Sequence, residues 1–158
     1  MKLAELQTQL ARALTGHGIS ENLNVADVTL AAELLVAKRR IEAASWLPRT
    51  SRILGSEFVR RFARFAKNHR PSGSIHPRTD AIDFATAIAA DRGLPRRTRD
   101  VAAYEEAQAR AGAPGPLFIA QRVQTDGTQR DDTLAGIHLW WRWSRRSHLR
   151  YVHLPWSK

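Results

Sequence analysis

The stretch SEFVRRFARFAKNHRPSG, residues 56–73, carries three phenylalanines and five arginine or lysine residues in a single short segment. Phe58, Phe62 and Phe65 recur at i, i+4 and i+7, which is the spacing of one face of an α-helix. The pattern predicts an amphipathic helix over residues 57–69, with its aromatic rings in a core and its charged side outward. We therefore interpret the rings as core residues, since bases stack on aromatic side chains that are exposed.

The basic side of this helix is a candidate for binding a partner. Arg60, Arg64 and Lys67 repeat the i, i+4, i+7 spacing on a rotated face. Residues 47–79 hold eight basic and one acidic side chain, a balance of +7, and residues 112–158 hold seven and three, a balance of +4. The whole chain carries a net charge of +10. Most of these cations are arginines, which favour bidentate contact with carboxylates or phosphates. The charge favours a nucleic acid as the partner.

Outward from this helix, hydrophobic spacing predicts four further helices. They cover residues 2–14, 25–46, 80–91 and 99–111, and a short helical turn, PRTSRIL, precedes Gly55. On the second of them we expect Leu30, Leu34, Ile41 and Trp46 to mark the buried side.

The hydrophobic pattern of the chain changes at AGAPGP, residues 111–116. Beyond it, PLFIAQRVQ, LAGIHLWWRW and HLRYVHLP alternate as β-strands do, with turn residues between them. The predicted fold class is α+β: a bundle of about five helices in residues 1–111, then a small antiparallel meander in residues 117–158.

Sequence signatures of catalysis and of metal binding are absent. The chain has no cysteine, and its six histidines show neither HExxH nor any other paired metal spacing. It contains neither a nucleophile elbow nor a glycine-rich phosphate loop. No apolar run approaches the roughly 20 residues that span a bilayer. We therefore expect a non-enzymatic, cytoplasmic protein without a metal or other cofactor of its own.

The C-terminal tryptophans occupy both faces of one predicted strand. One face carries Ile137, Leu139, Trp141 and Trp143. If these side chains have only a structural role, they pack on the helices. Trp140 shares the other face with His138 and Arg142, and an exposed aromatic face would suit binding. The sequence does not decide whether the tryptophan cluster belongs to the core or to a binding interface. An edge strand can also accept a peptide. The candidate peptide-binding residues are Trp140, Arg142, Arg145, Arg146 and Arg150.

Several of these segments resemble a known family. LAELQTQLARALTG, RRIEAASWLPRTSRILGSEFVRRFARFAKNHRPSG, DAIDFATAIAA and DVAAYEEA are similar to successive helices of the HvfC-like group of putative DNA-binding-domain proteins, to which MbnC and TglI are related. The resemblance spans about residues 1–111. The family's usual Tyr-Arg-x-Asn step is replaced here by LLVAKRR.

The resemblance implies a non-catalytic partner of a multinuclear non-haem iron oxidase that modifies ribosomally made peptides. Such a partner binds the precursor (leader) peptide, and the iron belongs to the enzyme. In this reading the C-terminal meander would hold the peptide. The basic face with Arg60, Arg64 and Lys67 would meet the enzyme or an acidic leader. A basic DNA-binding transcriptional regulator is the alternative, and a stand-alone enzyme is the least supported reading.

Overall fold

The computed structural model describes Thr8 and residues 25–69, 76–113, 117–123, 135–144 and 146–155. These residues form five helices followed by a three-stranded antiparallel sheet, which confirms the predicted α+β fold. The elements are α2 (Val25–Trp46), α3 (Pro48–Leu54), α4 (Ser56–Asn68), α5 (Pro77–Ala90), α6 (Arg96–Ala111), β1 (Leu117–Val123), β2 (Gly136–Arg142) and β3 (Arg150–Pro155). Apart from Thr8, the helix predicted over residues 2–14 lies outside the described residues.

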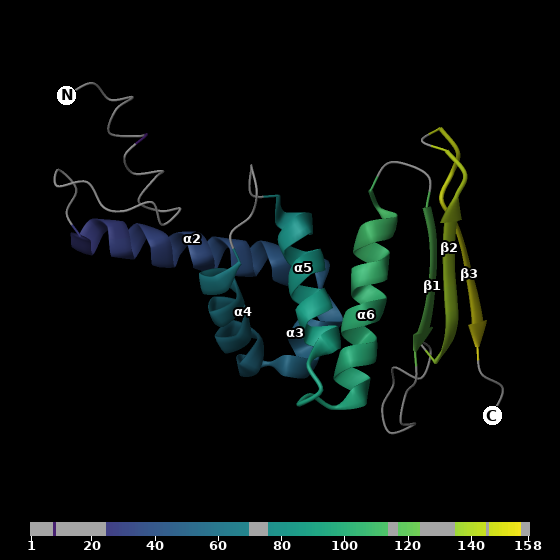
Figure 1. Cartoon of the computed structure of the whole chain (residues 1–158), viewed down its shortest axis with the longest axis horizontal. Helices are drawn as coiled ribbons and strands as arrows, with labels where there is room; N and C mark the ends of the chain where they lie inside the picture. Colours follow the sequence, from purple (N-terminus) through teal and green to yellow (C-terminus); the bar gives the residue numbers. More distant parts are fainter. Residues whose placement is uncertain are drawn as a thin grey trace.

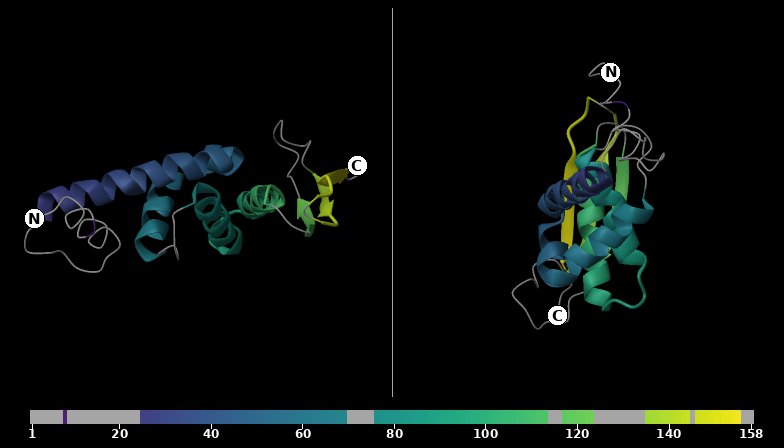
Figure 2. Two further views of the ribbon diagram at one scale, coloured as in Figure 1. Left: turned by 90° about the horizontal axis from the view of Figure 1, so that it is seen from above. Right: turned by 90° about the vertical axis from the view of Figure 1, so that its left-hand side faces the viewer.

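The elements follow one another across the molecule from the long helix α2 to the sheet (Figure 1). Helices α3, α4 and α5 lie along one side of α2, and α6 stands between α5 and the sheet. The left view in Figure 2 shows the sheet at one end of the molecule, with α6 beside one of its faces. The other face of the sheet has no described element packed on it.

The core of the helical part is built around the phenylalanines of α4. Phe58 and Phe62 are 2% and 0% exposed, as the spacing predicts. Their rings meet Phe84 of α5 edge-on, at centroid distances of 5.2 and 5.1 Å. Ala43 and Leu47 complete this cluster from the end of α2 and the residue after it. Phe58 and Phe62 are therefore core residues, whereas Phe65 is half-buried at the edge of this cluster, and the basic face of α4 remains on the surface.

Two helices begin earlier than predicted, and a proline is present at each start. Helix α5 begins at Pro77, where the missing N–H of proline costs no hydrogen bond. The side chain of His76 accepts a hydrogen bond from the backbone N–H of Arg78 and caps this helix. Helix α6 begins at Arg96, directly after Pro95, three residues before the predicted start at residue 99, and Thr98 lies buried inside its first turn.

The buried side of α2 differs from the prediction. Leu30, Leu34, Ile41 and Trp46 are 57%, 62%, 64% and 41% exposed, so these four assignments were wrong. The helix instead buries Val28, Arg39 and Ala43. Arg39 is 6% exposed and forms a two-point ion pair with the buried carboxylate of Asp80, at 2.7 and 2.8 Å. A buried arginine breaks the apolar periodicity on which the prediction depended.

A buried carboxylate joins α3 to α6. The two side-chain oxygens of Glu105 accept hydrogen bonds from the backbone N–H groups of Arg49 and Thr50, at 2.8 and 2.9 Å. These N–H groups lie in the first turn of α3, where no intrahelical acceptor exists. Glu105 is 2% exposed, and it serves as the N-terminal cap that α3 lacks in its own sequence.

Candidate functional site

The inner face of the sheet packs on α6. Trp140 is 4% exposed and lies in a cluster with Tyr104, Ala107, Ala111 and Val123. The ring of Tyr104 is 5.6 Å from that of Trp140. The alanines of α6 are small, so they leave room for an indole side chain. The proposed exposure of Trp140 was therefore wrong, and the two faces of β2 are reversed relative to the expected packing.

A polar cluster completes this inner face. His138 is fully buried, and its Nδ1 atom lies 2.8 Å from the hydroxyl of Tyr151. The ring of His138 also stacks on that of His153, with centroids 4.3 Å apart. Burial raises the pKa of Tyr151, and the neighbouring Tyr104 raises it further. Tyr151 itself is 47% exposed, so its hydroxyl lies at the edge of this cluster.

The outer face of the sheet is apolar and exposed to solvent. Phe118 and Trp141 lie opposite one another on β1 and β2 and share this face. Phe118 is 74% exposed and Trp143 is 80% exposed. A groove of about 640 Å³ is lined by Leu117, Phe118, Leu139, Trp141, Arg142 and Trp143. Its volume lies within the range of about 300–1,000 Å³ that is typical of binding pockets. Contiguous exposed apolar surface of this kind is characteristic of an interaction site.

Arginines supply the charge of the sheet. The described residues of the sheet and its turns include Arg122, Arg142, Arg146 and Arg150 and no aspartate or glutamate. Arg142 lines the groove and donates a hydrogen bond to the carbonyl oxygen of Ala113, which ties the sheet to the end of α6. Of the other predicted peptide-binding arginines, Arg146 and Arg150 are exposed, and Arg145 lies outside the described residues.

Phe118 is a candidate residue that the sequence prediction missed. The alternation in LFIAQRV could have identified it, because Phe118 alternates with Leu117 and Ile119, which face α6. The prediction concentrated on the tryptophans and did not treat the first strand as part of the same surface.

The basic stripe on α4 is exposed, as the helical spacing predicts. Arg60, Arg64 and Lys67 all lie on the surface. Arg60 pairs with Glu57 one turn earlier on the same helix. No ion pair is found for Arg64 or Lys67 within the described ranges, so both cations remain available to an anionic group.

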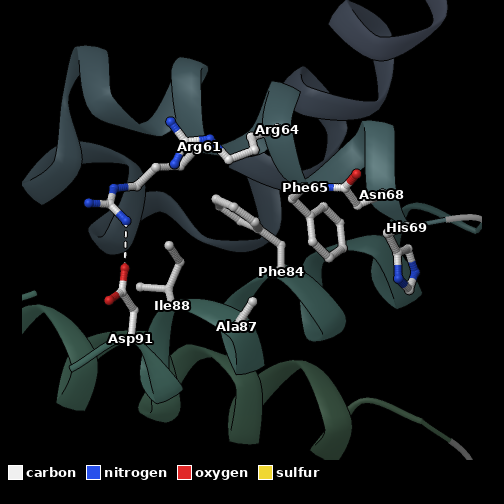
Figure 3. Close-up of a pocket in the computed structure, with 9 residues that line it drawn as sticks. All are labelled: Arg61, Arg64, Phe65, Asn68, His69, Phe84, Ala87, Ile88 and Asp91. Carbon is white, nitrogen blue, oxygen red and sulfur yellow. Dashed lines mark hydrogen bonds and ion pairs between the residues drawn. The ribbon is translucent and has the colours of Figure 1, made fainter. Parts of the chain in front are cut away.

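A second groove, of about 450 Å³, lies between α4 and α5 (Figure 3). Its floor consists of the rings of Phe65 and Phe84 with Ile88, and Arg64 extends along its α4 rim. At one end, the Nη1 atom of Arg61 lies 2.6 Å from the Oδ2 atom of Asp91. Sequence spacing identified Arg64 as a binding residue but gave no sign that an apolar groove would lie beside it.

Within the described residues, no three histidine, aspartate or glutamate side chains are grouped so that they could hold a metal ion. None of the described helices combines the length and the apolar character needed to cross a membrane.

Comparison with known proteins gives one family match. No curated protein and no solved structure matches the chain significantly. A family model described as "SCO6045-like, C-terminal domain" matches residues 4–90, which include α2 to α5 and exclude α6 and the sheet. Since this match covers more than half of the 158 residues, the chain belongs to the SCO6045-like C-terminal domain family.

Proposed function

We propose that this chain is a non-catalytic adaptor that holds a peptide on the outer face of its C-terminal sheet and presents it to a modifying enzyme. The observation that carries the proposal is the groove on that face, where Phe118 and Trp143 are exposed beside arginines. Tryptophan and arginine are the residue types that most often dominate binding energy at interfaces. The groove would accept apolar side chains of the peptide, and Arg150 and Arg146 would meet its acidic ones.

The enzyme class comes from the resemblance to HvfC-like proteins. In that reading the partner is a multinuclear non-haem iron oxidase, and the peptide is a ribosomally made precursor bound through its leader in the cytoplasm. The iron would be held by the oxidase, and this chain would supply recognition. The basic stripe of α4, with Arg60, Arg64 and Lys67, would contact the enzyme.

The test first looks beside the gene for this chain for an oxidase gene and a short precursor gene, and then combines their products with this chain. We expect the oxidase to modify the peptide efficiently only when this chain is present, as measured by mass spectrometry. Trp143→Ala should weaken peptide binding at least tenfold, by about 1.4 kcal/mol or more. Trp46→Ala is the matched control, since Trp46 is 41% exposed on the distant helix α2. Unchanged modification without this chain would refute the proposal.

The charge of +10 and the arginine stripe of α4 favour a second candidate, a DNA-binding regulator. Such a protein should bind duplex DNA with an affinity that falls steeply between about 50 and 200 mM salt, because neutralised phosphates release counterions. Fluorescence anisotropy with a labelled duplex measures this directly. An absence of binding at low salt excludes the regulator and leaves the adaptor.

A further inference from the structure

The groove between α4 and α5 is built by two antiparallel helices held apart by aromatic rings. Arg61, in the first half of α4, pairs with Asp91 just after α5, and His69, directly after α4, pairs with Asp83 in the middle of α5, at 3.1 Å. The two helices therefore run in opposite directions. The rings of Phe65 and Phe84 lie between them, with centroids 5.3 Å apart. The result is a shallow channel along the two helix axes (Figure 3).

The floor of this channel is apolar. Of the two arginines on its rim, only one is paired with carboxylates of the described residues. Phe84 and Ile88 are 1% and 3% exposed, so they form a closed apolar base. The cation of Arg61 is balanced by Asp91 and, at 3.5 Å, by Glu57. Arg64, midway along the rim, has no such carboxylate among the described residues. An anionic group is therefore favoured at the middle of the channel, directly above an apolar surface.

These features determine which kind of molecule fits. Two antiparallel helices with an apolar channel between them accept a third helix, whose apolar side chain enters the channel. A second copy of this chain would bring another molecule of charge +10 against the arginines of α4, and like charges oppose such pairing. Nucleic acid would use the arginines but would leave the apolar floor unfilled. A partner helix with acidic residues around one large apolar residue uses both features.

We propose that the groove between α4 and α5 binds an acidic helical segment of a partner protein. One apolar side chain of that segment packs on the half-buried ring of Phe65, in the groove that Phe84 and Ile88 close from below, and a neighbouring carboxylate binds Arg64. The proposal rests on the adaptor function, because it assigns the contact through which the adaptor binds its enzyme. It separates this contact from the peptide site on the outer face of the sheet.

The experiment uses the full chain and a defined probe, a labelled alanine-rich peptide of about 25 residues, because isolated helices shorter than about 12–15 residues are marginal in water. The probe carries one central phenylalanine with glutamates one turn away on each side. Two control probes replace the phenylalanine by alanine, or the glutamates by lysines. We expect the first probe to bind, and each control probe to bind at least tenfold more weakly. Amide shifts in the NMR spectrum should report contact at Ala87 and Asn68, which line the groove.

Charge reversal at Arg64 distinguishes a change in the binding site from a folding defect, because a folding defect would not increase the affinity for either probe. Arg64→Glu should lose affinity for the glutamate probe about tenfold and gain affinity for the lysine probe relative to the unmodified chain. Arg52→Glu is the matched control: Arg52 is exposed on α3, outside the groove, so this variant should bind both probes as the unmodified chain does.

The outcomes separate this proposal from the adaptor function. If Arg64→Glu and the unmodified chain bind the glutamate probe with equal affinity, and the lysine probe with equal affinity, the groove assignment is wrong. It is also wrong if the probe with alanine in place of phenylalanine binds as tightly as the first probe. The groove assignment is also wrong if duplex DNA displaces the probe and the affinity of the probe does not depend on its phenylalanine. The groove would then bind nucleic acid. Trp143→Ala should leave probe binding unchanged, so that loss of the sheet site is measured separately.

Discussion

Asp80 and Glu105 are both buried, and each binds atoms of a helix that is distant in sequence. Asp80 receives the guanidinium of Arg39 from α2, and Glu105 receives two backbone N–H groups from α3. Side chains of this kind lock helices into one arrangement, because a displaced helix would leave a buried charge without its partner. Apolar spacing does not reveal such contacts, and we did not predict either of them from the sequence.

The ion pair between Arg39 and Asp80 leads to the first prediction. Asp80→Ala leaves the guanidinium of Arg39 buried without a counter-charge, so we expect a loss of about 3–5 kcal/mol in the free energy of unfolding. Urea denaturation followed by circular dichroism measures it. Glu42→Ala is the control, because it removes only the exposed pair with Lys38, worth about 1 kcal/mol or less. A small effect of Asp80→Ala, similar to that of the control, would contradict the assignment.

At the scale of elements, α4 carries the clearest division between a core face and a surface face. Phe62 is fully buried, whereas Val59 on the same helix is 42% exposed. Phe62→Ala should therefore cost about 3–5 kcal/mol of folding free energy, through lost burial and an unfilled cavity. Val59→Ala should change it by only about 0.5 kcal/mol. Both are measured by urea denaturation, and comparable losses for the two variants would mean that the rings of α4 are not in the core.

The turn after α5 leads to a prediction about pH. The backbone N–H of Gly93, and then the guanidinium of Arg61, hold the pKa of Asp91 below its ordinary value. A carboxylate with a lowered folded pKa stabilises the fold above its unfolded pKa. That contribution is lost as the pH falls through the folded pKa. Arg61→Met should raise the pKa of Asp91 only partway, since Gly93 still donates its hydrogen bond.

NMR titration of the Asp91 carboxyl carbon measures this pKa. Arg60→Met is the matched control, because Arg60 lies beside Arg61 in sequence but pairs with Glu57 and should leave the titration unchanged. An ordinary pKa for Asp91 in the unmodified chain would contradict the geometry of the turn.

The elements differ in how far their sequence predicts them. The inner face of helix α4 was predicted correctly, because the spacing of its three phenylalanines and the spacing of its basic stripe indicate the same buried face. On α2 the predicted stripe of Leu30, Leu34 and Ile41 lies on a different side from the buried residues, because the buried side includes Arg39. Periodicity treats an arginine as exposed, and only the partner Asp80, 41 residues away, reverses that assignment.

The candidate site could be predicted only in part, for a related reason. Both alternating sets of β2 contain tryptophan, so the strand alone could not reveal which face is covered. The choice is made by α6, where Tyr104, Ala107 and Ala111 form a surface that accommodates Trp140. The exposed arginines of α4 were predicted from helical spacing, but the apolar grooves depend on contacts between elements.

At the scale of the whole molecule, α6 connects two separate clusters of buried residues. Ala102 of α6 belongs to the cluster around the phenylalanines, whereas Tyr104 belongs to the cluster around Trp140. One helix thus carries the helical part on one side and the sheet on the other (Figure 1). The peptide surface that we propose is supported through this second, smaller cluster, so its order depends on few side chains.

Two tryptophans on β2 and directly after it test this dependence, because they differ in burial and not in residue type. Trp140 is 4% exposed and Trp143 is 80% exposed. Trp140→Ala should cost about 3–5 kcal/mol. Hydrogen exchange should then accelerate at the amides of β1, β2 and β3, while the amides of α4 and α5 remain protected, because the sheet loosens from α6 while the helical core stays closed. Trp143→Ala should leave exchange throughout the described residues unchanged and should reduce only peptide binding. Equal exchange effects of the two substitutions would mean that the sheet does not depend on α6 for its order, and the outer face would then not be a surface held in place by the helical part.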